Sequence, residues 1–170
     1  MPFDFGLSRP ARLSPSNLVA EPLEDRHDHE YLAMRGCAVL AEVGYTFHIG
    51  GFGRDDWGFD VPYDMSTLVE QLPELLDGLA THGLGEVDFY SQGVERSVTF
   101  ERSAEAYVLR CRSRTSFTPS PDVEHVGAAR LGELFTRLTT EFSAGLRAAG
   151  SEIAGLHPFD TWHSRHWTLA

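Results

Sequence analysis

Four arginines are spaced so that their side chains could recognise an anion. Arg110, Arg112 and Arg114 occupy alternate positions, so in a strand they would share one face, about 7 Å apart. Arg96 belongs to the preceding alternating segment and could face them from a neighbouring strand. Guanidinium groups bind carboxylates and phosphates in a forked geometry, so the four residues predict an anion-binding face. The alternative is pairing with strand carboxylates, the candidates being Asp88, Glu95 and Glu101.

Histidines and an aspartate recur at every third position in the last part of the chain. Imidazole and carboxylate groups bind zinc, nickel or iron. Pro158 disrupts regular helix here, and the spacing matches no recognised ligand motif. We therefore expect no metal and no cofactor, and an aromatic tail that docks through Phe159, Trp162 and Trp167. The alternative is a metal-binding enzyme or accessory protein that uses His157, Asp160, His163 and His166.

A second histidine pair lies in the charged segment 24–30. His27 and His29 are separated by one residue. No apolar frame surrounds them, so we expect a solvated loop. Ligation of a divalent ion is the alternative, with further oxygen ligands from Asp25, Asp28 and Glu30.

The charge balance points to the kind of partner. The 170 residues include 25 acidic and 14 basic ones, and all 14 basic residues are arginine, giving a formal net charge of −11. This excess disfavours nucleic acid, whose phosphates need a basic footprint. It favours a basic protein partner, or solubility alone. The candidate contacts are the acids predicted to be exposed near a hairpin and the first helix: Asp55, Asp56, Asp60, Asp64, Glu70, Glu74 and Asp77.

Several functional classes lack their sequence signals. No G-x-S-x-G nucleophile motif occurs, and the glycines at 50, 51 and 53 precede a predicted strand rather than the helix that a phosphate loop requires. No apolar run is long enough to span a membrane, and the first ten residues do not resemble a signal peptide. We expect Cys37 and Cys111 to be buried free thiols, as in a cytoplasmic protein. The sequence leaves the oligomeric state open.

Alternation and helical periodicity predict the elements that position these residues. Apolar residues at every second position over 39–49 predict a strand, and a glycine-rich turn then leads to a second strand at 57–61. A one-sided leucine pattern predicts a helix over 67–82, with Thr67, Asp64 or Ser66 as its cap and Gly83 as its stop. A three-strand meander follows over 86–91, 94–101 and 106–115, and a second helix over 127–149.

The element order indicates an α+β fold of two layers. The order β-β-α-β-β-β-α predicts an antiparallel sheet of about five strands with two helices on one face. Residues 1–35 are predicted to form an irregular arm, and residues 36–170 a single α+β domain with the aromatic, histidine-rich tail.

Three segments within residues 36–149 carry a resemblance: WGFDVPYD at 57–64, EQLPELL at 70–76 and DFYSQGVER at 88–96. Together they resemble a recurrent uncharacterised actinobacterial α+β domain. In size, acidity and architecture the chain is also similar to immunity proteins of bacterial toxin systems. This resemblance implies a non-enzymatic protein that binds a basic, toxin-like partner, and it assigns no functional residue. A small anionic-ligand binder that uses the arginine face is a further alternative.

Overall fold

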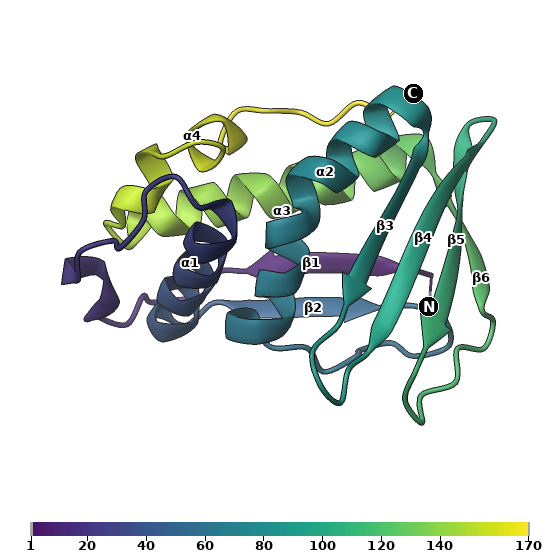
Figure 1. Ribbon diagram of the computed structural model, residues 1–170, viewed down its shortest axis with the longest axis horizontal. Coiled ribbons are helices and arrows are strands. Elements are labelled where there is room, and N and C mark those ends of the chain that lie inside the picture. Colours follow the sequence, from purple (N-terminus) through teal and green to yellow (C-terminus); the bar gives the residue numbers. More distant parts are fainter. Residues whose placement is uncertain (1, 170) are drawn as a thin grey trace.

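Two antiparallel sheets and four α-helices make up residues 2–169, the part of the chain that the computed structural model describes (Figure 1). The strands are β1 (Asp4–Ser8), β2 (Thr46–Gly50), β3 (Leu84–Phe89), β4 (Arg96–Ser103), β5 (Ala106–Ser113) and β6 (Val123–Gly127). The helices are α1 (His29–Val43), α2 (Ser66–His82), α3 (Ala128–Ala148) and α4 (Phe159–Trp162). Short 3₁₀ turns occur at Leu18–Ala20 and Glu152–Gly155, and a π-helical turn, called the π-turn below, occurs at Val61–Met65.

The larger sheet has the strand order β3-β4-β5-β6, and β1 pairs with β2 alone. Figure 1 shows the β1–β2 pair and the helices on one side of the larger sheet. Buried residues alternate with exposed ones along its strands, so one face joins the core and the other meets solvent. None of the helices in residues 2–169 is both long and apolar enough to cross a membrane.

The two predicted amphipathic helices are confirmed. The leucine pattern of α2 is buried from Leu68 to Leu79, and the chain leaves the helix at Gly83 with φ 68°, the left-handed conformation that glycine adopts readily. The stripe of α3 from Leu131 to Leu146 is buried as well. The start of α2 differs from the prediction. Asp60 caps the π-turn that leads directly into the helix, and Thr67 lies inside the helix.

The predicted strand over 39–49 is wrong for its first half. Residues up to Val43 belong to α1, which Asp28 caps by accepting a hydrogen bond from the Tyr31 backbone N–H. Gly44 ends this helix with φ 103°. The buried side of α1 follows helical spacing, although its last turns also imitate a period of two; the buried residues are Leu32, Ala33, Gly36, Cys37, Val39, Leu40 and Val43.

The predicted hairpin and the single five-stranded sheet are also corrected. Residues 57–61 form no strand, and β2 pairs instead with β1, so that Phe5 lies opposite Ile49. The arm predicted for residues 1–35 therefore contains β1 and the first turns of α1. Pairing between β1 and β2 joins segments about forty residues apart, which local periodicity does not report.

A buried carboxylate joins the two sheets. Glu124 points inward from β6 and accepts hydrogen bonds from the backbone N–H groups of Phe3 and Phe52. These donors lie before β1 and in the turn after β2, so one side chain satisfies polar groups from both segments. Phe3 also contacts Phe100 edge-on, with ring centroids 6.0 Å apart. The smaller sheet is thus held against β4 and β6.

Candidate functional site: an acidic, aromatic groove

The π-turn directs one aromatic ring into solvent. The Asp60 carboxylate accepts hydrogen bonds from the backbone N–H groups of Tyr63 (2.9 Å) and Asp64 (3.0 Å), which fixes the turn before α2. Val61 and Met65 are buried on its inner side. Tyr63 therefore points outward and is 71% exposed. Helical irregularities of this kind are frequent at functional sites.

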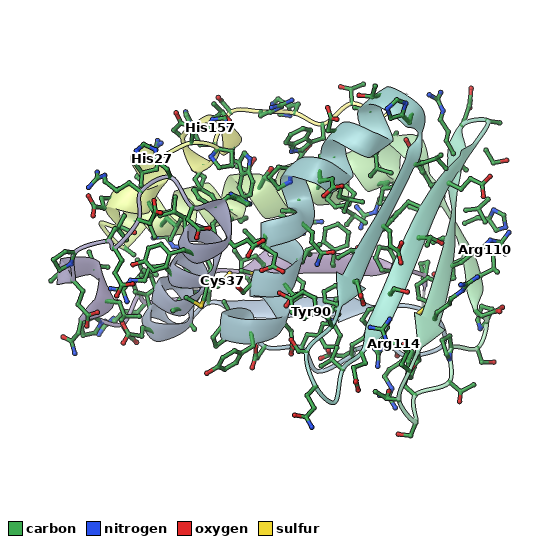
Figure 2. The ribbon with its side chains drawn as sticks, viewed as in Figure 1. His27, Cys37, Tyr90, Arg110, Arg114 and His157 are labelled. Carbon is green, nitrogen blue, oxygen red and sulfur yellow. The ribbon has the colours of Figure 1, made fainter. Side chains whose placement is uncertain are left out.

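Exposed apolar side chains gather at this point of the surface. Four large hydrophobic residues in the described part of the chain are exposed, and three of them line one groove of about 420 Å³. Met34 comes from α1, Tyr63 from the π-turn and Tyr90 from the end of β3. Figure 2 shows Tyr90 between α2 and the β3 end of the larger sheet. Clustered exposed apolar residues rimmed by polar ones mark interaction surfaces, whereas scattered ones do not.

The same groove carries negative charge. Asp28 and Glu30 reach it from the start of α1, and Glu70 reaches it from the first turns of α2. Among the residues that line it in the described structure there is no arginine and no histidine. We call this site the acidic groove. Its rings and carboxylates together suit a cationic side chain with a hydrocarbon stem.

Hydrogen bonds fix the walls of the acidic groove. The Tyr90 hydroxyl donates to the Glu70 carboxylate, and this bond raises the pKa of Tyr90 to about 12, with burial and the charge of Glu70 adding to the rise. Behind it, the Gln71 amide donates to the Asp88 carbonyl and accepts from the Asp88 N–H, both at 2.9 Å. The end of β3 is thus tied to α2, which holds the Tyr90 ring in place.

The acidic surface continues along α2. A second groove of about 420 Å³ lies between α2 and β3, and the fourth exposed apolar residue, Leu84, lines it. Its carboxylates are Glu74, Glu86 and Asp88. All four exposed apolar residues therefore lie beside acids.

The seven acids predicted to contact a partner divide into several places. Glu70 and Glu74 line the two grooves. Asp60 caps the π-turn, and Asp64 lines a different pocket beside Arg96. The remaining three are exposed and line neither groove: Asp55 and Asp56 in the turn after β2, and Asp77 on α2.

The predicted four-arginine face is not brought together. Arg110 and Arg112 are exposed on the solvent face of β5, and Figure 2 shows Arg110 directed away from the helices. Arg114 lies just beyond β5 and pairs with Asp88 at 2.8 Å, the carboxylate pairing given as the alternative. Arg96 lies opposite Ser113 on the inward face and is buried. Val98, two residues further along β4, is also buried.

The histidines do not converge on an ion. Within residues 2–169, no group of three or more His, Cys, Asp or Glu side chains is arranged to hold a metal. His157 is exposed, and His163 contacts the Asp160 carbonyl through Nδ1 at 2.7 Å. Instead the aromatic residues anchor the tail: Phe159 and Trp162 are buried, and the Trp167 indole donates to the Thr139 hydroxyl.

The histidine pair in the segment 24–30, His27 and His29, does not form a common site either. His29 begins α1, stacks on Phe159 with ring centroids 5.5 Å apart and contacts the Val69 carbonyl. His27 is exposed (Figure 2). The two side chains have different surroundings.

Sequence reasoning missed most of the acidic groove. It proposed Glu70 but not Met34, Tyr63 or Tyr90. A helical interpretation of 29–43 would have placed Met34 on the exposed side of α1, opposite Leu32 and Gly36. The exposure of the two tyrosines depends on the π-turn and on the end of β3, which have no distinct sequence signal.

Neither cysteine offers a reactive thiolate. Cys37 and Cys111 are buried and unpaired, as predicted. Burial raises the pKa of both thiols, that of Cys111 to about 12. Because the thiolate is the nucleophile, both groups are inert at neutral pH.

Comparison of the chain with models of known protein families, with curated proteins and with solved structures gives no match. The acidic groove brings together three exposed apolar side chains and three carboxylates.

Proposed function

We propose that the protein is a non-enzymatic binding protein of the immunity type, whose acidic groove takes a basic segment of a toxin-like protein partner. The observation that supports this proposal is the gathering of Met34, Tyr63 and Tyr90 around carboxylates. The inert thiols and the strongly negative net charge of −11 agree with a binding role in the cytoplasm.

An arginine or lysine of the partner fits the groove in a specific manner. Its hydrocarbon stem covers Met34, which is 52% exposed, and so removes apolar surface from water. Its cationic head lies over the ring of Tyr63 or Tyr90 and between Glu30 and Glu70. Aromatic residues dominate the binding energy of most interfaces, and charges at the rim mainly speed association.

The first test is a set of affinities for a defined basic probe. A short peptide of alternating arginine and glycine is titrated into the protein by calorimetry, and the same peptide with glutamate in place of arginine is the control. Tyr63→Ala should weaken binding by roughly thirtyfold, the loss expected of an aromatic hot spot. Leu84→Ala, an exposed apolar residue outside the acidic groove, should change it much less.

Variants that each remove one negative charge distinguish binding in the acidic groove from general attraction of the peptide to an acidic surface. Glu70→Gln should weaken binding several-fold, whereas Asp77→Asn, an exposed acid on the same helix, should have little effect. Equal losses in these two variants, together with no loss in Tyr63→Ala, would show that the peptide binds diffusely and would reject the groove as the site.

A further inference from the structure

Arg96 is buried among aromatic rings. Its side chain enters the core side of the larger sheet and is 4% exposed. The guanidinium carbon lies 3.8 Å from the ring centroid of Phe117, 4.4 Å from that of Trp57 and 5.4 Å from that of Phe59. Ring faces attract the positive charge and compensate part of its lost hydration.

The aromatic rings do not provide hydrogen-bond acceptors for the N–H donors of Arg96. Its Nε and Nη1 atoms are buried and have no hydrogen-bond partner among the described residues. An attraction to a ring face does not satisfy an N–H group in the guanidinium plane. Leaving such a buried donor unpaired costs about 1–3 kcal/mol. The exposed Arg114, by contrast, reaches the Asp88 carboxylate at 2.8 Å.

Within residues 2–169, no carboxylate forms an ion pair with Arg96 as Asp88 does with Arg114. Asp64 is the acid whose charge acts on Arg96, but the two residues form no ion pair in the described structure. The Oδ2 atom of Asp64 instead accepts a hydrogen bond from the Asp60 N–H at 3.0 Å. Arg54 also lies over the ring of Phe117, with its guanidinium carbon 5.0 Å from the ring centroid. Two arginines therefore face one carboxylate.

Arg96 lines a pocket of about 350 Å³, which is enough for a small molecule. We call it the Arg96 pocket. Arg54 and Asp64 also line it, as do the polar residues Thr115 and Ser116 and the backbone at Gly58 and Gly93. The polar lining suits a compact polar acid.

We propose that the Arg96 pocket binds a small organic carboxylate, whose two oxygens accept hydrogen bonds from the Arg96 guanidinium. A planar carboxylate matches the guanidinium fork, and it supplies acceptors to donors that the protein leaves unpaired. Arg54 adds positive charge at the rim, and Asp64 opposes the anion. This site is separate from the acidic groove and takes a ligand of opposite charge.

Succinate is the probe, and the Nε–H signal of Arg96 in a protein labelled with nitrogen-15 is the readout. Succinate should shift this signal with a saturable curve and leave the Nε–H signals of Arg110 and Arg112 in place. Arg96→Met should weaken the calorimetric affinity by about tenfold or more, because a buried charged partner is lost. Arg110→Met, an exposed arginine on the other face of the sheet, is the matched control and should bind like the wild type.

Variants of Arg54 and Asp64, the other charged residues that line the Arg96 pocket, provide a second test if Arg96→Met does not fold. Arg54→Met should weaken succinate binding several-fold, and Asp64→Asn should strengthen it, because each changes the charge that the anion meets. The absence of a saturable shift in the wild type, or equal binding by wild type and Arg54→Met, would overturn the proposal. Binding of inorganic phosphate in preference to succinate would overturn the carboxylate assignment. None of these residues lines the acidic groove, so failure here is distinct from failure of the peptide test.

Discussion

The acidic groove and the Arg96 pocket draw lining residues from the same two segments, the π-turn and residues 90–94. Tyr63 and Tyr90 line the groove, whereas Asp64 and Gly93 line the pocket. In the groove, the large apolar side chains of Met34, Tyr63 and Tyr90 are exposed to solvent. In the pocket Trp57 and Phe59 are buried and Phe117 is half-buried, and the guanidinium donors lack acceptors among the described residues.

This difference indicates what each site needs. Exposed apolar surface gains free energy when another macromolecule covers it, in proportion to the area removed from water. An unpaired buried donor gains instead from a few atoms with the correct geometry. The groove is therefore suited to a protein segment and the pocket to a small ligand. This distinction would be wrong if variants of the groove affected small-ligand binding, or if variants of the pocket affected peptide binding.

The largest expected difference is between two aromatic residues, Trp57 of the Arg96 pocket and Tyr63 of the acidic groove. Trp57 is 7% exposed, packs edge-on against Phe89 at 6.1 Å and donates to the Gly51 carbonyl. Trp57→Ala should lower the free energy of unfolding by about 3–5 kcal/mol. Tyr63→Ala should change it by less than about 0.5 kcal/mol, because its ring is in solvent. Denaturant unfolding measures both, and a similar loss in the two variants would contradict the assigned burial.

A smaller effect should distinguish the two kinds of arginine. Arg96→Met exchanges unpaired donors and cation–π contacts for an apolar chain, so the free energy of unfolding should stay within about 1 kcal/mol of the wild type or rise. Arg114→Met removes an exposed ion pair and should leave the denaturant midpoint nearly unchanged. A loss of about 3–5 kcal/mol in Arg96→Met would mean that its buried charge is well paired in solution.

The smallest effect concerns the hydroxyl that fixes the groove wall. The Glu70 carboxylate raises the pKa of Tyr90 from 10.0 to about 12, so folding favours the neutral hydroxyl. The stability that this shift contributes is present below pH 10 and is lost as the pH rises through about 12. Glu70→Gln should lower the pKa of Tyr90 toward its ordinary value, measured by the carbon-13 signal of the ring. An unchanged titration would show that the hydroxyl does not bind Glu70.

Sequence patterns predicted the elements whose apolar residues all face one way. The helices α2 and α3, and the strands β3, β4 and β5, have such patterns over several turns or positions. The helix α1 was missed because its final residues also alternate with a period of two. In β6 one of the two inward positions is taken by Glu124 rather than by an apolar residue, which hides the apolar pattern.

The candidate sites were less predictable than the fold. Arg96 was identified as an anion-binding residue, but together with Arg110 and Arg112, which lie on the opposite face of the sheet, and Arg114, which lies beyond β5. Its unpaired donors result from the packing of Trp57 and Phe117, which come from loops distant in sequence. The acidic groove likewise combines three segments, and only tertiary structure brings Met34 to the two tyrosines.

Binding in the acidic groove is tested most directly by a map of backbone amide shifts as the arginine–glycine peptide is added to labelled protein. The largest shifts should gather at Tyr31, Met34, Tyr63, Glu70 and Tyr90, around the acidic groove. Residues of the open sheet face, such as Arg110 and His125, should not move. Shifts spread evenly over exposed acids such as Asp77, with none concentrated at the groove, would contradict the account.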